Sequence, residues 1–143
     1  DKNPVYKVQY AHARMCSIFK KAGVDQASVG TEGVDLSMLT AEVERELIKA
    51  LGQFPDLVRN AARLRAPHLI CDYLEQTAGA VNSWYHAGNP SRNPELAVLV
   101  EDENLRNARL ALTRSIQIVL RNGLAVLGIR APEQMVREDS DAA

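Results

Sequence analysis

The sequence of 143 residues predicts an all-α fold, an antiparallel bundle of about five helices. Apolar residues recur at helical spacing in several long segments, and no segment shows the strict alternation of a half-buried strand. Hydrophobic residues make up 46% of the chain but aromatic residues only 5%, so Ala, Leu, Val and Ile supply the apolar volume. Short connections between the helical segments favour antiparallel neighbours.

The first helix is predicted over residues 4–22, because a proline stands in its first turn and Gly23 follows its last residue. Residues 24–39 form an acidic connection rich in turn residues. Thr40 is the expected N-cap of a second helix. That helix carries acids in its first turn, where they complement the helix dipole, and it ends near residue 51.

The next segment, FPDLVRNAARLRAPH, starts a helix twice, with Pro55 and Pro67 each expected at a first helical position. An apolar stripe of helical period follows Pro67, and the letters GNPSRNP then mark a loop. The last long helix is predicted over residues 103–122, with Gly123 as its stop. Residues 1–135 are therefore expected to form one domain, with residues 1–22 as a linking first helix. Residues 136–143 read as a disordered acidic tail.

Composition excludes several classes of protein. No apolar run approaches the roughly 20 residues of a membrane-spanning helix, and the start of the chain lacks a targeting pattern. Cys16 and Cys71 lie far apart and outside any C-x-x-C pair, which favours reduced thiols and a cytoplasmic location. The formal net charge of −1 means that any nucleic-acid partner must be attracted by a local surface. Neither a membrane nor DNA is expected as a partner.

Charge is distributed unevenly along the chain. Residues 104–132 contain no acid but five arginines, and four of these fall within an arc of roughly 140° on a helical wheel: Arg106, Arg109, Arg114 and Arg121. This face is either a solvated stripe or a contact surface for phosphates. Arg109 has a further alternative, because it could pair with an internal acid such as Asp72.

The stretch QYAHAR, residues 9–14, combines a phenol, an imidazole and a guanidinium. On a helix, Tyr6, Tyr10 and Arg14 would lie on one side, because they stand four positions apart. Aromatic rings and a planar cation on one face suit unpaired nucleotide bases. The same pattern also fits half-buried tyrosines covered by an arginine, and the residues alone leave both interpretations open.

Two cysteine–histidine pairs at helical spacing raise further alternatives. His12 with Cys16 and His68 with Cys71 would supply the ligands of a Cys2His2 zinc site, or a reactive thiol. Neither pair has a tight metal-binding spacing, and buried cysteines with capping histidines are the favoured interpretation. We therefore predict no metal site. Known catalytic motifs and paired carboxylates are also missing, so no catalytic residue is assigned.

Five blocks of the sequence, taken in order, resemble one family across residues 3–135. These blocks are NPVYKVQYAHARMCSIFKKAG, ERELIKALGQFPDLVRNAA, PHLICDYLEQTAGAVNSWYH, ARLALTRSIQIVLRNGLAVLGI and APEQM. They resemble the DALR-type anticodon-binding domain of arginyl-tRNA synthetases, which are class I enzymes. The four letters that name the family do not appear here as such, and the corresponding stretch reads ARLAL, at residues 108–112. The resemblance implies a helical bundle that binds the anticodon arm of arginine tRNA.

The resemblance also implies what the chain lacks. The HIGH-like and KMSKS-like motifs of the catalytic half are not in these 143 residues. The chain is therefore expected to be a C-terminal domain that does not activate arginine by itself and holds no cofactor. ATP and Mg²⁺ would belong to the catalytic half of the parent ligase, and that half is an expected partner.

Residue roles carry over from the family by position. Tyr10 and Arg14 match the Tyr and Arg of its Y-A-H-A-R stretch, which form the pocket for the middle anticodon base. The family's aromatic segment that faces the anticodon loop corresponds to VNSWYH, so Tyr85 is the match and Trp84 its neighbour. Met135 matches the family's final Met, which contacts the loop. In contrast to the family pattern, eight residues with three acids follow that Met here.

The basic helix completes the expected tRNA-binding set with Arg109 and Arg114, as contacts to loop phosphates. A different class of function stays open as an alternative. The bundle could be a protein–protein docking module without RNA binding of its own, with the segment Val5 to Tyr10 as its contact.

Overall fold

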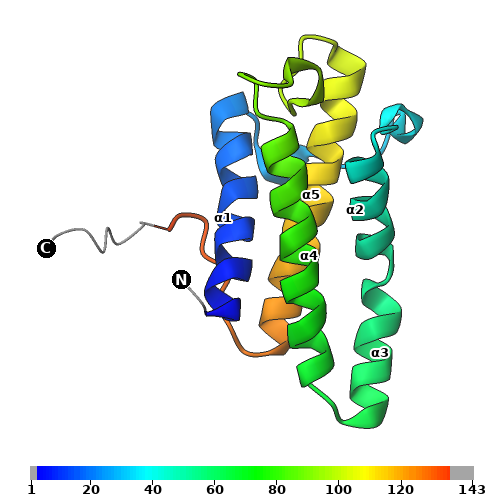
Figure 1. Ribbon diagram of the computed structural model, residues 1–143, viewed down its shortest axis with the longest axis vertical. Helices are drawn as coiled ribbons and strands as arrows, with labels where there is room; N and C mark the ends of the chain where they lie inside the picture. The colour runs from blue at the N-terminus through cyan, green and yellow to red at the C-terminus, as the bar shows by residue number, and fades with distance from the viewer. Residues whose placement is uncertain (1–2, 136–143) are drawn as a thin grey trace, which may run out of the picture.

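The computed structural model describes residues 3–135, and within that range all regular secondary structure is helical, with no strand. Its five α-helices and three short 3-10 helices are α1 (Pro4–Ala22), η1 (Gln26–Ser28), η2 (Leu36–Met38), α2 (Glu42–Gly52), α3 (Phe54–Leu64), α4 (His68–Ala87), η3 (Pro94–Leu96) and α5 (Glu103–Val126). Helices α2 and α3 follow each other end to end along one side of the bundle, with α1 on the opposite side and α4 and α5 between them (Figure 1). The predicted all-α bundle is confirmed.

Helix α1 has the bounds that local signals predict. The Asn3 side chain accepts a hydrogen bond from the backbone N–H of Val5 at 3.0 Å, and Pro4 occupies the first turn. At the other end Gly23 adopts φ 67°, a left-handed conformation that costs a residue without a Cβ little.

The starts of the next helices differ from prediction. Thr40 is not the N-cap of α2; Ala41 takes that position without a side-chain hydrogen bond. Pro55 is the second residue of α3, and Pro67 is the N-cap of α4 rather than its first residue. A proline fits each of these places for the same reason, since the missing N–H is not needed for the helical ladder there.

Helix α5 runs past Gly123 to Val126, so the predicted stop was wrong. Gly123 serves packing instead, because a Cβ at this position would lie 2.5 Å from Cδ2 of Leu74 on α4. A glycine there allows α4 and α5 to approach closely. The turn after the helix uses Gly128, which has φ 72°.

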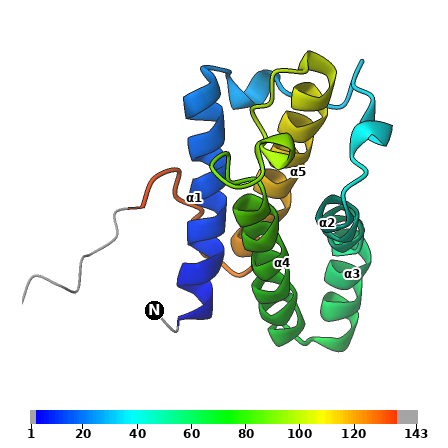
Figure 2. The same ribbon diagram turned by 45° about the horizontal axis from the view of Figure 1, so that its top comes forward.

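The core lies where α1, α4 and α5 meet. Helix α2 packs against α4 and α5 on the side away from α1 (Figure 2). Its largest fully buried apolar side chains come from all four of these helices: Met15, Leu47, Leu74, Ile116, Leu120 and Leu124. Among the residues that the structure describes, no helix is both long and apolar enough to cross a bilayer.

After α5 the chain returns along α1. The side chain of Gln9 donates to the carbonyl of Arg130 at 2.9 Å, and Nδ1 of His12 lies 3.0 Å from the carbonyl of Pro132. Two side chains of α1 thus hold the segment 130–135, which we call the C-terminal segment. The predicted acidic tail, residues 136–143, lies outside the described residues.

Candidate functional site

A contact between α1 and α4 holds the guanidinium of Arg14 in place. Its Nη1 donates to Oδ1 of Asn82 at 2.9 Å, and its Cζ lies 4.9 Å from the centroid of the Tyr85 ring. All three side chains are half-buried, so each keeps part of its surface open to a ligand. We call Tyr10, Arg14, Asn82 and Tyr85 the α1–α4 surface.

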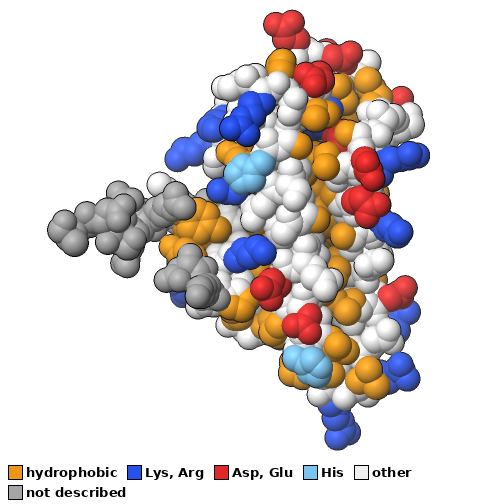
Figure 3. Space-filling model, in the orientation of Figure 1, with side chains coloured by type: hydrophobic (Ala, Val, Ile, Leu, Met, Phe, Trp, Pro, Cys, Tyr) orange, Lys and Arg blue, Asp and Glu red, His pale blue; other side chains and the backbone are white. Residues whose placement is uncertain are grey.

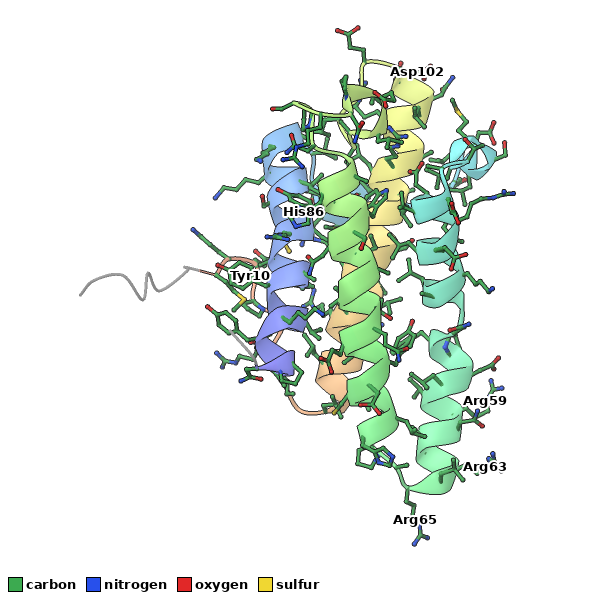
Figure 4. The ribbon with its side chains drawn as sticks, in the orientation of Figure 1. Tyr10, Arg59, Arg63, Arg65, His86 and Asp102 are labelled. Carbon is green, nitrogen blue, oxygen red and sulfur yellow. The ribbon has the colours of Figure 1, made fainter. Side chains whose placement is uncertain are left out.

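Tyr10 lies one turn before Arg14 and is also half-buried. Its ring meets that of Tyr6 edge to face, with centroids 5.3 Å apart. Figure 4 shows Tyr10 on the outer side of α1, away from α5. At the same level Figure 3 shows a hydrophobic patch with Lys and Arg side chains around it. The row of Tyr6, Tyr10 and Arg14 predicted from the spacing is therefore present on one side of α1.

This arrangement suits planar, electron-rich ligands. Half-exposed phenol rings offer faces on which bases stack, and a guanidinium pairs with base edges or phosphate oxygens. Arg14 is fixed before any ligand arrives, because a hydrogen bond and a cation–π contact hold it together. A ligand at this surface would therefore meet an arginine that is already ordered.

Met135 is the last described residue of the C-terminal segment, and it is half-buried. The two anchors of that segment, Gln9 and His12, flank Tyr10 in the sequence. The fold thus brings the C-terminal segment to the same turn of α1 that carries Tyr10. The role that the sequence resemblance implies for Met135, a contact to the anticodon loop, stays a prediction.

His12 is 97% buried, given its exposed fraction of 3%. Burial is the main effect on its pKa and lowers it from the ordinary value of 6.5. The hydrogen bond to the Pro132 carbonyl and the charge of Glu133 oppose this shift, whereas Arg121 and Arg114 add to it. Neutral His12 is therefore the form that holds the C-terminal segment.

The lowered pKa of His12 predicts an acid-sensitive stability. Well above pH 6.5 the titration of His12 should not change the free energy of unfolding, because both folded and unfolded states then hold it neutral. Below pH 6.5 the unfolded state binds the proton first, so stability falls as pH falls, by at most about 1.4 kcal/mol per pH unit for one proton. Urea unfolding between pH 7.5 and 5.5 measures this slope.

His12→Gln should remove the part of that slope that comes from His12, because glutamine does not titrate. If the free energy of unfolding changes with pH equally in wild type and in His12→Gln, protonation of His12 is not coupled to unfolding.

Trp84 does not lie on the α1–α4 surface. Its ring is only 2% exposed, and its Nε1 donates to Oε2 of Glu44 at 3.4 Å in the core. Neighbours on a helix point about 100° apart, so Tyr85 faces α1 while Trp84 faces α2. The prediction that Trp84 contacts RNA is corrected: in this fold its ring packs in the core.

Arg109 is also a core residue, with 3% of its surface exposed. Its Nε pairs with Oε2 of Glu44 at 3.1 Å, and its Nη1 donates to the carbonyls of Glu95 and Ala97, each at 2.7 Å. The predicted phosphate contact is therefore wrong for Arg109. An internal acid does pair with it, but the acid is Glu44 and not the exposed Asp72.

The other arginines of α5 do not form one continuous basic face. Arg106 donates to the carbonyls of Val100 and Glu101, both at 3.1 Å, at the helix start. Arg114 is half-buried and donates to Oε1 of Gln117 at 3.0 Å, while Arg121 is exposed. Residues 108–113 are all buried, because α1, α2 and α4 surround this part of α5. A helical wheel assumes one buried side, and that assumption fails here.

Of the two cysteine–histidine pairs, His12 and Cys16 do lie in contact, with Nδ1 of His12 3.9 Å from Sγ of Cys16. Cys16 is buried, its Sγ accepts from Nε2 of Gln117 at 3.1 Å, and burial raises the pKa of its thiol. A raised pKa favours the unreactive thiol over the thiolate. Cys71 is exposed. No group of three or more potential metal ligands occurs among residues 3–135.

A cleft of about 590 Å³ lies on another side of α1, between its C-terminal half, η1 and the C-terminal segment. It is lined by Cys16 and Phe19 and by charges of both signs, Lys20 with Asp25 and Glu133. The α1–α4 residues are not among its lining. Its mixed charge does not select a ligand class.

Two residues of importance escaped the sequence interpretation. Asn82 stands three positions before Tyr85, and that spacing on one helix face was a usable signal. Glu44 is fully buried and shares the inner face of α2 with Leu47 and Leu51. An acid at an apolar position of an amphipathic helix indicates a buried partner, here Arg109.

Comparison with known proteins gives concordant results. Residues 8–135 match the family of the DALR anticodon binding domain. An arginine–tRNA ligase of Coxiella burnetii (strain RSA 331 / Henzerling II) is 42% identical over 137 residues, covering 94% of this chain and 22% of the relative. One of Burkholderia orbicola (strain MC0-3) is 45% identical over 139 residues, with the same coverage. The solved arginyl-tRNA synthetase of Thermus thermophilus is 41% identical and superposes with a TM-score of 0.76 over 90% of this chain and 20% of that one.

Proposed function

The chain belongs to the DALR anticodon-binding domain family, in its arginyl-tRNA synthetase branch, and from that premise we propose that its α1–α4 surface binds the anticodon loop of arginine tRNA. One observation carries the proposal. Arg14 is held between Asn82 and Tyr85, one turn from the half-exposed ring of Tyr10. Stacking rings around a fixed guanidinium suit the recognition of unpaired RNA bases.

In this proposal Tyr10 and Tyr85 stack on unpaired bases, and Arg14 reads the middle anticodon base. Met135 contacts the loop from the C-terminal segment. Arg114 remains the candidate on α5 for a phosphate contact, since part of its surface is open. Phosphate contacts add affinity but little sequence choice, so specificity rests on the α1–α4 surface.

The chain spans about a fifth of the length of the curated relatives it matches, 22% of each. We propose that it acts with the catalytic domain of an arginine–tRNA ligase, to which ATP and Mg²⁺ would bind. Anticodon recognition would then position the distant acceptor end of the same tRNA for aminoacylation.

Replacement of Tyr10 tests the proposal. Tyr10→Ala should weaken binding of an arginine anticodon stem-loop by about 1–3 kcal/mol, the usual effect of removing one base-stacking ring. The Tm should change little, because the ring is half-exposed and lies outside the core. Fluorescence anisotropy with a labelled hairpin measures the affinity, and circular dichroism measures the Tm.

Two control variants sharpen the result. Tyr10→Phe keeps the ring and should bind like wild type. Arg59→Ala removes a positive charge from α3, on the opposite edge of the bundle from Tyr10 (Figure 4), and should also bind like wild type. Wild-type affinity in Tyr10→Ala, or equal losses in all three variants, would contradict the proposed site.

A further inference from the structure

The position of Arg14 depends on Asn82, a residue to which the resemblance assigned no role. Oδ1 of Asn82 accepts the 2.9 Å hydrogen bond from Arg14 Nη1 across the α1–α4 contact. Asn82 and Tyr85 stand three apart on α4, so both reach the same guanidinium from one helix face. Arg14 is thereby fixed at two points, one polar and one aromatic.

Fixing an arginine matters for recognition because its side chain is long. An unrestrained arginine samples many rotamers and can pair with any nearby phosphate. A restrained arginine presents its planar guanidinium in a single orientation. The loss of rotamer freedom is also complete before the ligand binds. An oriented guanidinium discriminates between base edges, and a mobile guanidinium contributes mainly charge.

We propose that Asn82 is a positioning residue that sets the base specificity of Arg14. The inference rests on the proposed function, since it requires that Arg14 contact the RNA. Asn82 acts through Arg14, so its removal reduces the preference for one middle base more than it reduces RNA binding in general.

We propose that the pocket at Arg14 is fitted to cytosine as the middle anticodon base. Asn82→Ala should then bind a hairpin with cytosine at that position with about tenfold lower affinity. Tenfold corresponds to 1.4 kcal/mol, close to the lower end for a hydrogen bond to a charged group. Affinity for a hairpin with guanine at that position should change less than about twofold, because charge attraction persists. Anisotropy titrations of the whole chain with the two labelled hairpins give both numbers.

A double-mutant cycle distinguishes an effect of Asn82 through Arg14 from a direct contact of Asn82 with the RNA. If Asn82 acts through Arg14, the variant Arg14→Ala/Asn82→Ala binds the cytosine hairpin as Arg14→Ala does. Asn82→Asp keeps an oxygen acceptor for Arg14, so it should retain the ratio of the two affinities even if its charge lowers both. Asn60→Ala is the matched control, since Asn60 accepts from Arg63 Nη2 at 3.4 Å on α3.

Each outcome decides a different statement. Additive effects of the two alanine variants overturn the positioning role, because Asn82 then acts independently of Arg14. Wild-type affinities and ratio in Asn82→Ala, together with weak binding by Arg14→Ala, overturn the inference and leave the proposed function standing. Wild-type affinities in Arg14→Ala and Tyr10→Ala overturn the proposed function and this inference with it.

Discussion

Replacing Glu44 with alanine should lower the free energy of unfolding by about 3–5 kcal/mol, as expected when one partner of a buried ion pair is removed. The pair with Arg109 is nearly inaccessible to water, with side-chain exposures of 4% for Arg109 and 2% for Glu44. Without the carboxylate, the guanidinium stays in the core with its charge uncompensated. Trp84 Nε1 loses its acceptor in the same variant. Urea unfolding followed by circular dichroism measures the change.

A matched control comes from the exposed pair of Arg59 and Asp56, joined at 3.2 Å with side-chain exposures of 77% and 80%. Asp56→Ala should change stability by no more than about 1 kcal/mol, because solvent screens this pair. Replacing both buried partners by apolar residues, as in Glu44→Leu with Arg109→Met, should restore part of the loss from Glu44→Ala, although the carbonyls of Glu95 and Ala97 then lose their donor. A loss of stability below about 1 kcal/mol in Glu44→Ala would contradict the buried position of the Arg109 guanidinium.

The presence of the helices and the bounds of α1 could be predicted from local signals, because caps and turn residues act within one or two turns. The capping side chain of Asn3 and the left-handed Gly23 set the ends of α1 without reference to the rest of the chain. Gly123 is different, since its role depends on Leu74, which lies far away in the sequence. A glycine inside a helix is indistinguishable from a stop until its neighbour on α4 is known.

The site could be predicted only in part, for the same reason. Tyr10 and Arg14 share a helix, so their common face follows from the spacing of four. Arg109 was misplaced because α5 is surrounded by other helices, and nothing local reveals that Glu44 faces it. The likeness to a family located Tyr85, whereas the hydrogen bond of Asn82 required the three-dimensional arrangement.

The neighbours Trp84 and Tyr85 should give opposite results when each is replaced by alanine. Trp84→Ala removes a large ring that is 2% exposed and should lower the free energy of unfolding by about 3–5 kcal/mol. Tyr85→Ala removes a half-buried ring at the surface, so the protein should stay folded but bind the arginine anticodon hairpin about 1–3 kcal/mol less tightly. Unfolding in urea and hairpin anisotropy, applied to both variants, separate the two effects.

Trp84→Phe makes the comparison informative even if Trp84→Ala does not fold. Phenylalanine keeps most of the apolar contact and loses the N–H that donates to Glu44, so stability should fall by less than in Trp84→Ala. Hairpin affinity should equal that of wild type, because the ring faces α2 and α5 and not the α1–α4 surface. If Trp84→Phe lowered the affinity for the hairpin as much as Tyr85→Ala does, Trp84 would have to contact the RNA. That result would contradict the structure, in which the ring is buried and donates to Glu44.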